Sequence, residues 1–161
     1  MSRSSAGLVA FLEIFLLALW LGASLFFAAA VAPAAFAVAP TASIAGALVG
    51  RLLPPLFVGG VVIAATIVVM ELRWPRAGSR LRASAAGVML AACAVAQFVI
   101  GGQIDRLRTV AGRPIATLER NDPRRVAFGR LHGLSVAALG AAMIAAATAA
   151  AGWRAPSEAR G

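Results

Sequence analysis

Four long apolar runs, separated by short polar segments, occupy most of the 161 residues. They cover approximately residues 7–32, 55–72, 82–102 and 127–152. A helix of about 17–25 apolar residues crosses a bilayer core, and each run reaches that length. An isolated strand in lipid would leave its backbone groups unpaired, which favours helices. The pattern therefore predicts an all-α four-transmembrane-helix bundle, with residues 1–161 forming a single integral membrane domain.

Specific residues mark where these helices are expected to start and stop. Pro33 and Pro40 are expected to end the first helix, because proline lacks the N–H that a helix interior uses. Asp122 and Pro123 predict the start of the last helix, since aspartate caps helices and proline suits their first position. The first run is too long for a typical signal-peptide core and contains Glu13, so we expect a retained helix.

The segment before the second span is less apolar than the spans themselves. Residues 41–53 carry Arg51, which predicts an interfacial helix at this point. Pro54 and Pro55 follow and are expected to kink or restart that helix.

Composition agrees with a membrane protein. Hydrophobic residues make up 61% of the chain and charged residues 13%, whereas about a quarter of a soluble domain is charged. The single cysteine, Cys93, excludes an internal disulfide framework. The net charge of +9 comes from arginines that bracket the apolar runs. This placement predicts the lipid bilayer as a partner and no nucleic acid.

The arginines divide almost evenly between the two membrane sides. The side with both termini carries seven and the other side eight. Four of them lie in the compact loop of residues 73–82, which favours cytoplasmic termini in a bacterial inner membrane. Trp74 and Trp153 are expected to form an interfacial aromatic belt on the terminal side.

Glu13 is an acid within the first span, about six residues from its start. An ionisable group at that depth is costly and usually paired. Arg82 is the predicted partner, because it lies on the same side. A structural ion pair, a proton- or cation-handling carboxylate and simple interface exposure all remain open.

A polar cluster is expected at the opposite side of the bundle. Its predicted members are His132, Ser135, Gln103, Asp105 and Arg51. The histidine is either a structural residue or a group that binds a ligand or a proton. Because it is the only histidine, we expect no metal site and no haem held by two histidines.

Small residues recur every four positions in the last span, at Gly133, Ala137, Ala141, Ala145 and Ala149. Gly46 and Gly50 form a second pair with this spacing. Such spacing lets helix backbones approach closely, within the chain or against a second copy or another membrane protein.

Catalytic signals are absent from the sequence. It contains no glycine-rich phosphate loop, no nucleophile–base motif and no HExxH pattern. We therefore expect no enzymatic activity, no catalytic residues and no cofactor.

Two segments together resemble a known family. Residues 17–36 match its first-helix pattern at Trp20, Gly22, Phe26, Phe27, Val31, Ala32, Pro33 and Phe36. Residues 128–135 match a last-helix pattern at Phe128, Leu131, His132 and Ser135. The sequence is similar in this respect to the domain of unknown function 4149 proteins, the transmembrane protein 205-like family. The resemblance implies a four-helix membrane protein and no established reaction. Leu139 departs from the polar residue expected there, so a hydrogen-bonding role does not carry over to it.

Two main hypotheses for function follow, and a quinone- or haem-linked redox subunit is a third, which the lack of ligands disfavours. The first is a transporter-like bundle that handles a small solute, with the polar cluster around His132 as its site. The second is a structural or accessory subunit of a membrane complex that packs through small-residue helix faces. A solvent-accessible pocket that reaches His132 would favour the first, and a tightly packed bundle the second.

Overall fold

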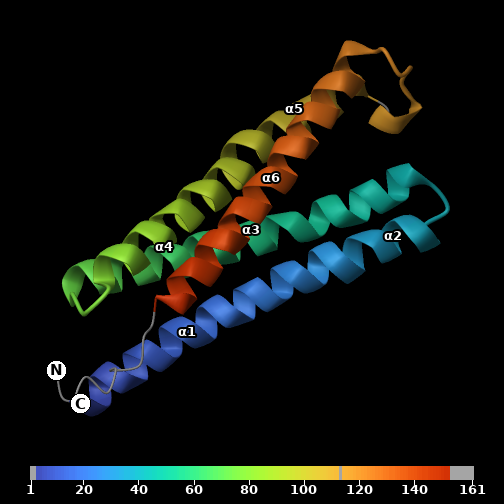
Figure 1. Ribbon diagram of the computed structural model, residues 1–161. Coiled ribbons are helices and arrows are strands. Elements are labelled where there is room, and N and C mark those ends of the chain that lie inside the picture. The colour runs from blue at the N-terminus through green and yellow to red at the C-terminus, as the bar shows by residue number, and fades with distance from the viewer. Residues whose placement is uncertain (1–2, 113, 153–161) are drawn as a thin grey trace.

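The computed structural model describes residues 3–112 and 114–152, and within them the chain is helical with no strand (Figure 1). Four helical segments are long and apolar enough to cross a membrane: Gly7–Val38, Ala42–Arg73, Ser79–Ala111 and Pro123–Ala151. The predicted four-transmembrane-helix bundle is confirmed. Each segment extends beyond the apolar run that predicted it, at one end or both.

The first span passes through a proline. It consists of α1 (Arg3–Phe26), the π-helical turn η1 (Phe27–Val31) and α2 (Ala32–Val38). Pro33 therefore does not end the helix, contrary to the prediction. It occupies the first turn of α2, where a missing N–H is tolerated, directly after a turn of wider backbone.

The second span is one continuous helix, α3 (Ala42–Arg73), although Pro54 and Pro55 lie inside it. Thr41 caps its start by accepting a hydrogen bond from the Ile44 N–H at 3.3 Å. No separate interfacial helix precedes this span, because residues 42–53 are its first turns. Val49 and Phe57 lie before and after the two prolines and are buried in the same core, which holds the two parts in line.

The third span comprises α4 (Ser79–Ala94), the π-helical turn η2 (Val95–Gly101) and α5 (Gly102–Ala111). It stops at Gly112, which takes a left-handed conformation (φ 62°) that favours glycine. A short 3₁₀ turn, η3 (Ile115–Thr117), leads to α6 (Pro123–Ala151). As predicted, Asp122 caps α6 by accepting the Arg124 N–H at 2.8 Å.

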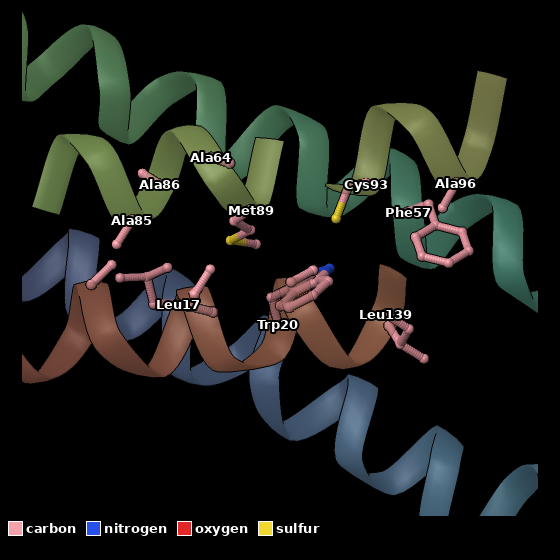
Figure 2. Packing of buried hydrophobic residues seen from close by; sticks show 14 of the residues in the cluster. Leu17, Trp20, Phe57, Ala64, Ala85, Ala86, Met89, Cys93, Ala96 and Leu139 are labelled. Carbon is pink, nitrogen blue, oxygen red and sulfur yellow. The ribbon is translucent and has the colours of Figure 1, made fainter. Parts of the chain in front are cut away.

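α4 packs against α3 and α6, and α1 lies against the same two helices. Figure 2 shows Met89 and Cys93 of α4 at the centre of the core, near Leu17 and Trp20 of α1. Since apolar burial gives little drive for association in lipid, close packing of such side chains holds the bundle together.

The helices come together at one end and diverge toward the other (Figure 1). The start of α1, the α3–α4 loop and the end of α6 lie at the closed end. At the other end, the α2–α3 pair separates from the α5–α6 pair. The two ends carry different polar groups, and each is a candidate site.

The repeated small residues of α6 do not share one buried face. Gly133, Ala137 and Ala141 are exposed, whereas Ala145 and Ala149 are buried. Four residues turn a helix about 40° beyond a full circle, so a four-residue repeat winds around it. The buried face instead follows the helical period, through Ser135, Leu139, Ala142, Ala146 and Ala149.

Candidate functional site: a buried ion-pair network and an open cavity

The closed end of the bundle holds two buried carboxylates joined by Arg76. Glu13 of α1 and Glu71 of α3 are each 1% exposed. Arg76 Nη2 lies 2.7 Å from Glu13 Oε1 and 3.0 Å from Glu71 Oε1. This single guanidinium therefore connects the first span, the second span and the loop that follows it.

Arg82 of α4 binds Glu71 through two of its nitrogens. Its Nε lies 2.7 Å from Glu71 Oε1, and its Nη2 lies 3.1 Å from Oε2. The Arg82 Nη1 donates to the carbonyl of Ala77 at 2.8 Å and to that of Gly152 at 3.3 Å. The Ser79 hydroxyl donates to the carboxylate of Glu71 and to the backbone carbonyl of Glu71. These bonds tie α3, α4 and the end of α6 to one carboxylate.

Glu13 thus pairs with Arg76 rather than with Arg82, the partner predicted from the sequence. The difference arises because α3 continues to Arg73, which places Glu71 inside the helix and directly beside Arg82. Glu71 stands in the sequence at the start of a polar, loop-like segment, so the sequence alone does not indicate that this acid is buried. Among the described residues, two acids and two arginines balance one another in charge, which lowers the cost of burying them.

The divergent end contains a cavity of about 750 Å³. Its walls come from α2 and α3 on one side and from η2, α5, η3 and α6 on the other. Most of the lining is apolar. Its polar members are Ser43, Gln97, Asp105, Arg108, Arg125, His132 and Ser135.

Two arginines line this cavity where its walls reach the helix ends, Arg108 near the end of α5 and Arg125 near the start of α6, and we call this part of the cavity its mouth. The Arg108 guanidinium lies 5.7 Å from the centre of the Phe128 ring, in a cation–π arrangement. It also reaches α3, because a Cβ on Gly50 would lie 3.2 Å from Arg108 Nη2. Arg125 Nη1 donates to the Leu118 carbonyl at 2.6 Å, which holds the η3 segment against α6.

The aromatic and hydroxyl groups of α6 continue this lining. The His132 ring stacks on Phe128 with centroids 6.3 Å apart and planes at 5°. Ser135 lies about one turn further along α6 and is buried. The lining changes from charged groups at the helix ends to apolar groups with isolated polar atoms deeper in the bundle.

The structure brings together three of the five residues predicted to form the polar cluster. His132, Ser135 and Asp105 line the cavity. Gln103 instead lies with Arg106 and Arg130 in a separate groove between α5 and α6. Arg51 lines neither space and is exposed on α3.

Helix geometry accounts for these placements. Gln103 is two positions before Asp105, which turns it about 200° around α5, and Arg51 is about 100° away from the cavity-lining Gly50. Arg108 and Arg125 were not predicted as members of the cluster. The three-residue spacing of Asp105 and Arg108 is the signal that could have found the first of them.

The other residues that match the family patterns lie in different environments. Trp20 and Phe27 are buried, whereas Gly22 and Pro33 lie on the surface of the first span. Leu131 lines the groove that contains Gln103. Trp153, predicted to join Trp74 in an aromatic belt, lies outside the described residues, and Trp74 is half exposed. Over residues 3–112 and 114–152, no group of three acids, histidines or cysteines could hold a metal ion.

Four helical segments that are long and apolar enough to cross a membrane define a multi-pass helical membrane protein. A family model described as domain of unknown function (DUF4149) matches residues 15–113, and the chain belongs to this family. The matched region contains the first-helix motif and ends before residues 128–135. No curated protein and no solved structure matches the chain.

Proposed function

We propose that the protein is a transporter-like bundle that binds a small solute in the cavity at its divergent end. The observation that supports this most directly is the cavity itself, about 750 Å³ in volume and reaching His132 and Ser135. Small-molecule sites have volumes of about 300–1,000 Å³ and combine apolar walls with a few polar groups. The proposal includes no catalytic step and no cofactor.

The contrast between the two ends of the bundle supports this function. At the closed end, Glu13, Glu71, Arg76 and Arg82 tie all parts of the bundle together. At the other end, the helices part around the cavity. A bundle held at one end and open at the other can admit a solute without losing its fold.

Blocking the cavity tests the proposal. A Cβ on Gly46, which lines the cavity, would meet nothing within 4 Å, so Gly46→Phe fills the space without a clash at its base. Gly133→Phe is the matched control, because Gly133 is exposed and also has open space. Small molecules that co-purify in mild detergent are identified by mass spectrometry.

We expect the wild type and Gly133→Phe to carry the same small molecule and Gly46→Phe to lose it. The same set of bound molecules in all three proteins would refute solute binding in this cavity.

A second candidate function is an accessory subunit of a membrane complex. Gly133, Ala137 and Ala141 are exposed on α6, which leaves room for a helix of another protein or a second copy. Ala137→Leu would then release a co-purifying membrane protein, whereas the neighbouring exposed substitution Val136→Leu would retain it. Unchanged association in Ala137→Leu would exclude this surface.

A further inference from the structure

We infer that the solute is a single-chain amphiphile with an anionic head group, either a carboxylate or a phosphate. This inference rests on the proposed function and names the ligand class of the same cavity. It depends on four features: the balance of charges at the mouth, the geometry of the arginines, the apolar walls behind them and the order of these groups along the helices.

The mouth of the cavity carries an excess of positive charge. Among the described lining residues, two side chains are arginines, Arg108 and Arg125, and one is a carboxylate, Asp105. The Asp105 side chain is 79% exposed, and its Oδ1 lies 3.9 Å from Arg108 Nη1. An ion pair with such an exposed carboxylate and such a long N–O distance contributes little binding energy. The arginines therefore retain capacity to bind an external anion.

Arginine side chains suit carboxylates and phosphates in particular. The guanidinium has five N–H donors in a planar fork that can bind two oxygens at once. Arg125 uses Nη1 on the Leu118 carbonyl. That contact and the Phe128 ring beneath Arg108 position both groups at the mouth before any ligand arrives.

The walls behind the arginines suit a hydrocarbon chain. They are formed largely by Phe36, Val49, Leu53, Phe57, Ile104 and Phe128. Among the described lining residues, the hydroxyl and amide side chains are those of Ser43, Gln97 and Ser135. Ser43 lies in the first turn of α3, and the other two lie deeper in the spans. A compact anion such as inorganic phosphate would leave these apolar walls uncovered, whereas an alkyl chain would fill them.

The order of these groups along the helices matches the arrangement of an amphiphile in one bilayer leaflet. Asp105 and Arg108 lie near the end of α5, and Arg125 near the start of α6, at one boundary of the predicted spans. Phe57 and Ser135 lie further inside. An amphiphile would enter with its head group at the interface and its chain toward the bundle centre.

Direct binding to the full chain in phosphatidylcholine nanodiscs tests the inference. Radiolabelled decanoate and decyl phosphate are the anionic probes, and decanol, decyltrimethylammonium and inorganic phosphate are the comparison probes. The test variants are Arg108→Gln and Arg125→Gln. Arg106→Gln and Arg130→Gln are the controls, since these arginines lie on the same helices but line the other groove. Thermal unfolding of each variant reports whether it is folded, and Arg108→Lys tests whether charge alone is sufficient.

We expect both anionic amphiphiles to bind and Arg108→Gln to weaken them about tenfold, the loss for one charge-assisted hydrogen bond. Arg125→Gln should act in the same direction, and the two controls should bind like the wild type. Stronger binding of decanoate than of decyl phosphate, or the reverse, identifies the head group. Arg108→Lys should recover only part of the affinity.

Other results would overturn the inference. Equal weakening by all four glutamine variants would mean general attraction to a basic surface. Equal binding of decanol or decyltrimethylammonium would exclude an anionic head group but leave solute binding in the cavity intact. Inorganic phosphate binding as tightly as decyl phosphate would exclude the alkyl chain. If no probe binds, the inference that the solute is an anionic amphiphile is rejected. The proposal that the cavity binds a solute is tested separately, by whether Gly46→Phe loses the bound molecule.

Discussion

The indole N–H of Trp20 donates a 2.9 Å hydrogen bond to the backbone carbonyl of Leu56, which joins α1 to α3. Gly60 lies one turn further along α3 and makes this contact sterically feasible. A Cβ at Gly60 would lie 2.6 Å from Cys93 Sγ and 2.9 Å from Trp20 Nε1. Three helices therefore meet at one glycine.

Substitution of Gly60 by alanine should destabilise the bundle by about 1–3 kcal/mol, the usual cost of overpacking a core. Gly87→Ala is the control, because a Cβ there would meet nothing within 4 Å. Unfolding by SDS titration from mild detergent measures the difference. Adding Cys93→Ala to Gly60→Ala should recover part of the lost stability, because it removes the sulfur atom nearest to the new Cβ. Equal stability of Gly60→Ala and Gly87→Ala would contradict the close approach.

The buried ion-pair network predicts a graded response to neutralising its two acids. Glu71 accepts hydrogen bonds from Arg76, Arg82 and Ser79, so Glu71→Gln should cost about 3–5 kcal/mol, as for other broken buried pairs. Glu13 accepts from Arg76 through Oε1, and Gln can keep that bond, so Glu13→Gln should cost less.

The matched control for these two variants is Asp105→Asn, whose carboxylate is exposed and should contribute less than about 1 kcal/mol. SDS titration of all three proteins gives the order of stability. A smaller effect for Glu71→Gln than for Glu13→Gln would show that Glu71 is not the centre of the network.

Membrane orientation is expected to place the α3–α4 loop in the cytoplasm. In a Cys93→Ala background, Ala77→Cys and Thr117→Cys put single reactive thiols in exposed positions at opposite ends of the bundle. A membrane-impermeant maleimide should label Thr117→Cys in intact cells and Ala77→Cys only after permeabilisation. The reverse pattern would place the termini outside.

Sequence alone predicted four long apolar helices, because long apolar runs in lipid have few alternatives to a helix. It also identified the start of α6, since Asp122 and Pro123 act through local backbone geometry. Prolines were less informative. Pro33 and Pro54 lie inside continuous helices, where a π-helical turn and packing on both sides outweigh the local preference.

The candidate site was only partly predictable for a different reason. Membership of the cavity depends on the direction of each side chain, and one or two residues of helix move a group to another face. Arg51 and Gln103 point elsewhere for this reason, although their depth was consistent with the cluster. The partner of Glu13 depends on where α3 ends, which the sequence does not fix. That Glu71 is buried follows only from the packing of α3 against its neighbours.

The two neighbouring alanines Ala141 and Ala142 separate packing within the bundle from contacts with other proteins. Ala142 is fully buried against the core, whereas Ala141 is exposed. Ala142→Leu should therefore destabilise the monomer by about 1–3 kcal/mol through overpacking, and Ala141→Leu should leave SDS unfolding nearly unchanged. If Ala141 contacts a second copy or another membrane protein, Ala141→Leu will instead reduce cross-linking in membranes at constant monomer stability. Equal loss of stability in both variants would show that the face carrying Ala141 also packs inside the bundle, and the accessory-subunit function would lose its surface.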